Sequence, residues 1–270
     1  MDKYKRNERL AVMSQVLADN PNRIFTLSHF CEMFGAAKST VSEDTAILSR
    51  TLKEFGIGTL ETVTGASGGM RFRPMTQPGT GRRLLENICD QLKTPGRILP
   101  GGYLYFSDIL SDPTMVRGMS RVIAAEYYEK SIDFVLTMET KGIPVALMTA
   151  EALHVPLLIA RRSSKVYEGS AVNINYVSGH GGIETMSLSR RAAREGSTAL
   201  IVDDFMRGGG TARGMISLME EFRCRVEGIC FVLSTESSEQ RLPVCEKSLM
   251  VMRENGRGET PDIVVGDWVK

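Results

Sequence analysis

Apolar residues recur three and four positions apart over the first 55 residues, which is the spacing that places side chains on one face of a helix. The spacing predicts a first helix that stops at Asn20-Pro21 and a short second helix over 28–34 that Gly35 ends. A third helix follows directly, so that two helices are joined by a tight turn. This is the make-up of a helix-turn-helix.

The third helix is the candidate recognition helix of this motif. We expect Ser39 or Thr40 to be its N-cap, with Glu43 as the capping-box partner of Thr40. Residues 56–74 then read as strand, glycine-rich turn and strand, which predicts a winged helix-turn-helix. The expected inward positions of the third helix are Val41, Ala46, Ile47, Leu48, Leu52 and Phe55.

Polar and basic residues in this segment favour DNA binding over the alternative of a small helical cap that binds no nucleic acid. Short polar side chains open the third helix, where they can approach phosphates and base edges. Two arginines stand two positions apart on a wing strand, and therefore on one face of it. The N-terminal arm is basic and also holds Arg9. The candidate DNA-binding residues are Lys3, Lys5, Arg6, Lys38, Ser39, Thr40, Ser42, Arg71 and Arg73.

The rest of the chain has a different pattern, beginning after the loop sequence PMTQPGTG. We therefore predict a DNA-binding domain over 1–74 and a second domain over 75–270. Apolar runs alternate with helical patterns, which predicts an α/β domain with a parallel sheet and helices on both faces. Residues 171–189 instead read as a projecting hairpin. The expected strands are 133–138, 156–160, 197–202 and 226–233, and the expected helices are 114–130, 144–154 and 211–223.

Composition excludes several classes of protein. Lys and Arg number 33 against 32 Asp and Glu, so any nucleic-acid-binding surface must be a local one. The five cysteines contain no CxxC, which argues against a zinc site or a disulfide framework. No apolar run reaches the roughly 20 residues that a membrane span needs. We therefore expect a cytoplasmic protein.

The stretch TALIVDDFMRGGGTARGM, residues 198–215, carries the candidate chemistry. A buried strand leads into two carboxylates, Asp203 and Asp204, and then into a glycine-rich loop that opens a helix. Ligands of open α/β sheets bind at this edge. Backbone N–H groups of the loop and the helix N-terminus suit a phosphate, while paired carboxylates suit ribose hydroxyls or a divalent cation. A tight strand-to-helix turn without a ligand is the alternative reading.

This stretch closely resembles the phosphoribosyl-pyrophosphate (PRPP) motif of the type I phosphoribosyltransferases. The resemblance implies that the acids hold ribose hydroxyls, that the glycine loop holds the 5′-phosphate, and that residues 139–143 form a pyrophosphate loop. Residues 162–189 are the counterpart of the family's flexible hairpin. Arg207 departs from enzymes that place a catalytic acid at this position, because a guanidinium accepts no proton at neutral pH. The candidate PRPP-binding residues are Asp203, Asp204, Phe205, Met206, Arg207, Gly208, Gly209, Gly210, Thr211, Thr140, Lys141, Gly142 and Tyr103.

The winged helix together with residues 56–69, 97–110, 165–179 and 201–211 resembles the purine operon repressor family of Gram-positive bacteria. The resemblance implies a homodimer that represses purine-synthesis genes, with PRPP as an inducer that lowers operator affinity. Mg²⁺ is a candidate companion of PRPP, but the sequence does not identify the metal. It also implies no transferase activity. Two other interpretations remain: an active purine or pyrimidine phosphoribosyltransferase with an accessory DNA-binding domain, and a repressor whose second domain is only a dimerisation scaffold.

Two aromatic residues extend the candidate site. Tyr103 and Phe205 are placed to stack on a base, so that a guanine alarmone is a second candidate ligand of the PRPP site. Alternatively, Phe205 belongs to the core and Tyr103 packs on the sheet edge. Lys165 and Tyr167 are weaker candidates for contacts with pyrophosphate or DNA. PRPP and DNA are both polyanions, and both direct competition and an allosteric change are compatible with the sequence.

Overall fold

The computed structural model describes residues 4–65, 68–74, 79–100, 103–163, 169–178, 181–236, 242–253 and 262–270. The chain divides into two compact units. The first comprises Met1–Pro78 with Glu151–His154, and the second comprises Gly79–Ala150 with Val155–Lys270. Lys165 and Tyr167 lie outside the described residues.

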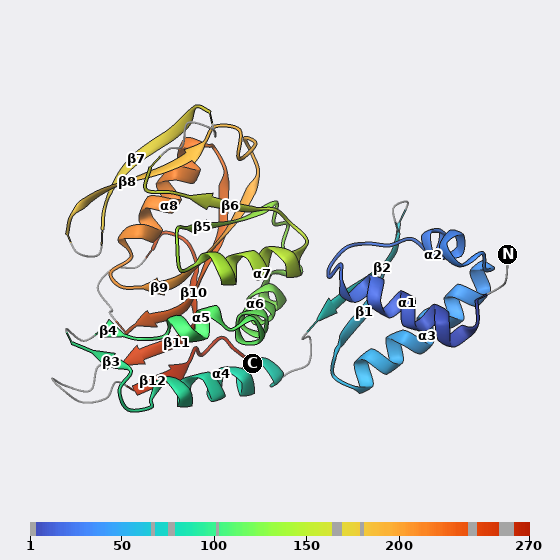
Figure 1. The fold of residues 1–270 in the computed structure, drawn as a ribbon. Helices are drawn as coiled ribbons and strands as arrows, with labels where there is room; N and C mark the ends of the chain where they lie inside the picture. Colours follow the sequence, from blue (N-terminus) through green and yellow to red (C-terminus); the bar gives the residue numbers. More distant parts are fainter. Residues whose placement is uncertain are drawn as a thin grey trace. The chain divides into compact units, whose positions relative to one another are not determined.

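The first unit is a winged helix-turn-helix, as the sequence predicts (Figure 1). Its helices are α1 (Arg6–Ala18), α2 (Leu27–Phe34) and α3 (Lys38–Glu54). The wing is the antiparallel pair β1 (Gly58–Val63) and β2 (Gly69–Pro74). Apolar side chains from all five elements meet in one core around Phe30, Met13 and Leu17.

The turn between α2 and α3 fixes where the recognition helix begins. Gly35 ends α2 in the left-handed region at φ 60°, where a glycine needs no compensation for a Cβ. The N-cap of α3 is Ala37, not Ser39 or Thr40, so the expected capping box with Glu43 is wrong. Only Ala36 lies between the C-cap of α2 and the N-cap of α3. Ser39 and Thr40 therefore lie within the first turn of α3.

The inward face of α3 also differs from the expected one. Val41, Leu48 and Leu52 are buried as predicted, but Ala46 is exposed and the side chain of Phe55 is 76% exposed. The buried position between Val41 and Leu48 is Asp44. A spacing of apolar residues does not reveal a buried carboxylate, because its burial depends on a cation from another helix.

The second unit is built on a six-stranded sheet in the order β12-β11-β10-β9-β5-β6. All neighbouring pairs are parallel except β11 with β12. The four predicted strands are confirmed to within two residues at each end, except that β9 continues four residues farther, to Met206. The sheet strands are β5 (Phe134–Met138), β6 (Leu157–Ala160), β9 (Thr198–Met206), β10 (Arg225–Thr235), β11 (Glu246–Arg253) and β12 (Asp262–Val265).

Helices cover the sheet, and a hairpin projects from it (Figure 1). On one side, α8 and the hairpin share a core with Leu136, Ile201 and Phe231 of the sheet. The expected hairpin over 171–189 is β7 (Ala171–Val177) and β8 (Ile183–Ser189). The helices are α4 (Thr80–Leu92), α5 (Ser107–Ser111), α6 (Pro113–Tyr127), α7 (Ile143–Leu153) and α8 (Gly210–Glu221).

Several elements were absent from the sequence prediction. These are α4, α5, the two C-terminal strands β11 and β12, and the two-residue strands β3 (Ile98–Leu99) and β4 (Tyr103–Leu104). All five cysteines are free thiols. No helix among the described residues is long and apolar enough to cross a membrane.

Candidate functional site

The acid pair lies at the carboxyl end of β9, in the middle of the sheet. Asp203 is 6% exposed, and its Oδ1 accepts hydrogen bonds from the Thr137 hydroxyl at 3.5 Å and from the Asp204 N–H at 3.1 Å. Asp204 is less buried and borders a pocket. The neighbouring strand β5 ends beside them, because parallel strands present their carboxyl ends at one edge of the sheet.

Two adjacent buried carboxylates disfavour each other's ionisation. Burial, and then the charge of Asp204, raise the pKa of Asp203 well above its usual value. Burial also raises the pKa of Asp204, although a hydrogen bond with Asp203 and the charge of Lys141 oppose this. A ligand that brings hydroxyl donors or a divalent cation to this pair therefore relieves an existing electrostatic cost.

The expected pyrophosphate loop packs directly against the acid pair. It follows β5 and leads into α7 at Ile143, and its Glu139–Thr140 peptide bond is cis. A Cβ on Gly142 would collide with Oδ1 of Asp203 and would lie 2.6 Å from Oγ1 of Thr137. Only a glycine therefore fits here. Lys141, in the same loop, is exposed.

The glycine-rich loop connects β9 to α8. Gly208 and Gly209 have φ values of 73° and 71°, and Gly209 is the N-cap of α8. The first N–H groups of a helix have no partner within the helix, and the helix N-terminus carries partial positive charge. Thr211 is half-buried in the first turn of α8, and Arg207 is exposed. This arrangement suits a phosphate group.

Two pockets collect most of the predicted PRPP residues. One, of about 340 Å³, is lined by side chains from the β3–β4 hairpin, the pyrophosphate loop and β9, among them Tyr103, Lys141, Asp204, Phe205 and Arg207. A second, of about 180 Å³, is lined by Met206, Gly209, Gly210 and Thr211 with Arg207. Phe205 is half-buried and faces Phe106 at 6.2 Å between ring centroids, so it lines a pocket in addition to packing.

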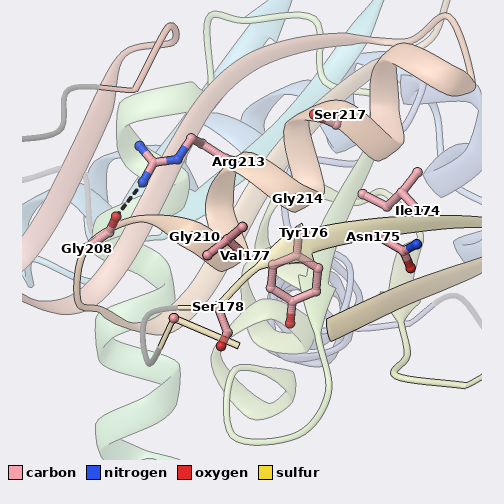
Figure 2. Close-up of a pocket in the computed structure, with 11 residues that line it drawn as sticks. Ile174, Asn175, Tyr176, Val177, Ser178, Gly208, Gly210, Arg213, Gly214 and Ser217 are labelled. Atoms are coloured by element: carbon pink, nitrogen blue, oxygen red, sulfur yellow. Dashed lines mark hydrogen bonds between the residues drawn. The ribbon is translucent and has the colours of Figure 1, made fainter. Parts of the chain in front are cut away.

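A third pocket, of about 700 Å³, lies between the hairpin and α8 (Figure 2). Its walls include Tyr176 and Ser178 of the hairpin side and Gly208, Arg213 and Ser217 of the loop and helix. Gly210 lines this pocket as well as the smaller one beside Met206, whereas Gly209 and Thr211 line the smaller one. Arg213 was not among the predicted residues, because a sequence does not show that a side chain folds back on its own loop.

The candidate DNA-binding residues of α3 lie at the start of the helix. Lys38, Ser39 and Ser42 are exposed, and Thr40 is half-buried. Ala46 and Arg50 are exposed farther along the same helix, and Ser39, Ser42, Ala46 and Arg50 follow one another at spacings of three, four and four residues. They share a face with the predicted residues. Prediction missed them because Ala46 was assigned to the core.

Basic residues of the N-terminal arm pair with acidic residues of α3. Arg6 lies 2.8 Å from Glu43 and 3.3 Å from Asp44. Arg9 is buried, with its Nε 2.6 Å from Asp44, so it joins α1 to α3 and does not face solvent. Lys5 is exposed, and Lys3 lies outside the described residues.

The two wing arginines lie on one face of β2, as predicted, but they are not equally accessible. Nε of Arg71 and Nη1 of Arg73 donate hydrogen bonds of 3.1 and 2.9 Å to the two carboxylate oxygens of Glu61. The side chain of Arg73 is only 3% exposed and also donates to Asn22. A phosphate contact by Arg73 is not compatible with this burial, whereas Arg71 is 23% exposed.

A winged helix-turn-helix followed by an α/β unit with an acid pair and a glycine-rich loop at one sheet edge defines a class: a DNA-binding protein with a second, α/β domain. Two family models match the chain accordingly, the N-terminal domain of the bacterial purine repressor over residues 5–74 and the phosphoribosyl transferase domain over 107–260. With the relatives described next, they show that the chain belongs to the family of bacterial purine biosynthesis regulators.

Three relatives illustrate this membership. The chain is 41% identical to the probable purine biosynthesis transcriptional regulator PurR of Streptococcus pneumoniae, over 98% of each chain. It is 42% identical to the purine biosynthesis transcriptional repressor PurR of Bacillus subtilis, over 89% of this chain and 85% of that one. It is also 42% identical to the purine biosynthesis transcriptional activator PurR of Lactococcus lactis, over 91% of both.

The second unit is also similar to enzymes. A xanthine phosphoribosyltransferase of Lactococcus lactis is 27% identical over 62% of this chain and 86% of that one. The solved structure of an adenine phosphoribosyltransferase from Thermoanaerobacter pseudethanolicus superposes with a TM-score of 0.55 at 20% identity, covering 63% of this chain and 99% of that one. At such identity the likeness shows the fold alone: the second unit has the phosphoribosyltransferase fold.

Proposed function

We propose that the protein binds operator DNA as a homodimer, represses purine-synthesis genes, and is released from DNA by PRPP. The observation that carries the effector assignment is the convergence of three features at one sheet edge: the acid pair, the loop held against it by Gly142, and the glycine loop before α8. A ribose that bears a phosphate at one end and a pyrophosphate at the other matches these three features.

Each part of PRPP has a chemically suitable partner. The carboxylates of Asp203 and Asp204 accept hydrogen bonds from ribose hydroxyls, which stabilises two groups whose pKa values are raised in the absence of a ligand. N–H groups of Gly209–Thr211 face the 5′-phosphate. Lys141 and backbone groups of Thr140 and Gly142 take the pyrophosphate.

Mg²⁺ fits the same site in a supporting role. Asp203 and Asp204 are hard oxygen ligands, and no larger group of acidic, histidine or cysteine side chains gathers for a metal within the described ranges. Magnesium commonly takes one or two carboxylates and completes its shell with phosphate oxygens and water. The ion would therefore bind together with PRPP and neutralise part of its charge.

We propose further that the second unit binds PRPP without transferring its ribose. Arg207 occupies the loop position at which several transferases place an acid, and a guanidinium cannot serve as a general base. Incubation with PRPP, Mg²⁺ and each purine base should yield no nucleotide. Formation of a nucleoside monophosphate by the native chain, and not by Asp203→Asn, would instead show that the protein is an enzyme.

DNA binding is assigned to the exposed face of α3 and to the wing. Lys38, Ser39, Thr40 and Ser42 would enter the major groove, and Arg71 would meet a phosphate, with Lys5 and Arg6 at the start of α1 as further contacts. Lys3 remains a candidate from the sequence. We no longer assign a DNA contact to Arg73, since it is buried.

The two functions must be linked thermodynamically. If PRPP lowers DNA affinity by some factor, DNA lowers PRPP affinity by the same factor. The aromatic pocket that contains Tyr103 and Phe205 would accept a base as well, so a guanine alarmone would compete with PRPP and keep the protein on DNA.

The test is a filter-retention titration of a DNA fragment from upstream of a purine-synthesis operon, with and without PRPP and Mg²⁺ at fixed salt. We expect specific binding that PRPP weakens, and no such weakening in the variant Asp203→Asn, Asp204→Asn. Specific DNA binding whose affinity PRPP does not change would overturn the effector assignment. Because one relative is named a repressor and another an activator, transcription from the bound promoter is measured in parallel. An increase in transcription on binding would show that the protein activates these genes and does not repress them.

A further inference from the structure

The phosphate-type loop contains three consecutive glycines, Gly208–Gly210. Glycine has the greatest backbone freedom of any residue, so a run of three is costly to hold in one conformation. Two of the three adopt the left-handed region in the folded chain. A contact from outside the glycine run is therefore needed to hold this loop ready for a ligand.

Arg213 supplies such a contact from the first turn of α8. Its Nη2 donates a hydrogen bond of 2.6 Å to the carbonyl oxygen of Gly208 (Figure 2). Its backbone N–H also donates to the carbonyl of Gly209 at 3.0 Å. Both terminal guanidinium nitrogens lie 3.7 Å from the position where a Cβ on Gly209 would stand. The side chain thus folds back over the loop that precedes its own helix.

The direction of this hydrogen bond matters for the ligand. A trans peptide is planar, so its C=O and N–H groups point in opposite directions. When Arg213 holds the carbonyl of Gly208, the N–H of Gly209 in the same peptide unit is turned away from the guanidinium. Gly208 and Arg213 line the pocket between the hairpin and α8, whereas Gly209 and Thr211 line the smaller pocket beside Met206.

We infer that Arg213 is a positioning residue for the effector: by holding the Gly208 carbonyl, it orients the Gly209 N–H toward the phosphate that the loop binds. The guanidinium acts through the loop and does not itself touch the ligand. The inference rests on the proposed function, since it takes the 5′-phosphate of PRPP as the group that this loop binds.

The test uses the full chain with Arg213→Met, which keeps the aliphatic length and removes the donors. Calorimetry measures the affinity for PRPP with Mg²⁺ directly, and for ribose 5-phosphate and pyrophosphate by displacement of PRPP. We expect PRPP and ribose 5-phosphate to bind about tenfold more weakly, the usual effect of losing one hydrogen bond from a charged group. The intrinsic affinity for pyrophosphate should not change, because residues 140–142 hold it.

Two further variants complete the experiment. Arg213→Lys restores one donor and should recover part of the loss. Arg223→Met, which removes an exposed arginine that pairs only with Glu195 among the described contacts, should leave all three affinities unchanged. In the absence of ligand, hydrogen exchange should quicken at the Gly209 and Gly210 amides of Arg213→Met while the amides of β9 and β10 keep their rates.

The outcomes separate this inference from the proposed function. If the native chain binds no PRPP, the proposed function fails together with the inference. If the native chain binds PRPP and Arg213→Met binds all three ligands equally well, only the positioning role is overturned. Equal losses for all three ligands would also overturn it, because they would indicate a general defect in the second unit.

Discussion

The two units of this protein treat buried charge in opposite ways. In the winged helix, Arg9 and Asp44 bury opposite charges 2.6 Å apart, and Arg73 is buried beside Glu61. In the phosphoribosyltransferase-like unit, Asp203 and Asp204 bury like charges side by side. Neither forms a salt bridge among the described residues, and Lys141 acts on Asp204 only as a nearby charge. Matched charges hold elements together, whereas two like charges without an ion-pair partner at a sheet edge mark a candidate functional site.

The largest effect that tests this comparison is expected at Asp44. Asp44→Ala leaves the buried Arg9 guanidinium without its carboxylate and should destabilise the winged helix by about 3–5 kcal/mol. Denaturant-dependent hydrogen exchange at Met13 and Leu17 measures the loss. The exposed ion pair between Glu43 and Arg6 provides the control, since Glu43→Ala should change stability by less than about 1 kcal/mol. Similar losses in both variants would contradict the assignment of the buried pair as the structural one.

The opposite sign is expected at Asp203. Asp203→Asn removes one of two like charges and should stabilise the second unit at pH 7 by about 1–2 kcal/mol while abolishing PRPP binding. Thermal unfolding and calorimetry measure the two effects on the same samples. Destabilisation of this unit would show that the pair is structural, as in the winged helix.

The pH dependence of that gain follows from the direction of the pKa shifts. Both acids have a raised pKa in the folded chain, so the folded state binds the proton more tightly than the unfolded state does. Their contribution to stability is therefore fully present below the unfolded pKa of about 4 and is lost as the pH rises toward the folded values. The difference in melting temperature between Asp203→Asn and the native chain should be near zero at pH 4 and grow toward pH 7. A constant difference would exclude this electrostatic origin.

The smallest effects are expected on the wing, where one acid serves two arginines. Arg71→Met should weaken DNA binding on every sequence and reduce the slope of log affinity against log salt by about one. Arg73→Met should leave that slope unchanged and lower the stability of the winged helix instead. A reduced slope in Arg73→Met would show that its side chain leaves the interior to meet DNA.

Local signals made much of this molecule predictable. A glycine directly after a helical pattern marks the end of the helix, and Gly35 ends α2 as predicted. The order of strand, acid pair and glycine loop over 198–211 was enough to place these residues at the carboxyl edge of a sheet. The wing arginines share a face because strands alternate with a period of two. The order of these features also carried the family resemblance.

What escaped prediction depends on partners distant in sequence. Arg9 was counted with the basic N-terminal arm and Arg73 was assigned to DNA, because their acidic partners lie 35 and 12 residues away in the sequence. Phe55 has the spacing of a core residue, but it is the C-cap of α3 and lies beyond Leu52, the last buried residue of that helix. The strand β12 is held by pairing with β11 and by contacts with α4, which is distant in sequence. Nothing in the sequence distinguishes Arg213 from other helical arginines; its role follows from the hydrogen bond that it donates to the Gly208 carbonyl in the folded chain.

The close approach of Gly142 to Asp203 has a consequence for genetics. Glycine and alanine codons differ by a single base, and a methyl group at this position would displace the Asp203 carboxylate. Under the proposed function, Gly142→Ala would yield a super-repressor that remains on its operator and no longer responds to PRPP. In a homodimer, such an allele would be dominant over the native gene, so that one point mutation would impose purine auxotrophy on a cell that carries both copies.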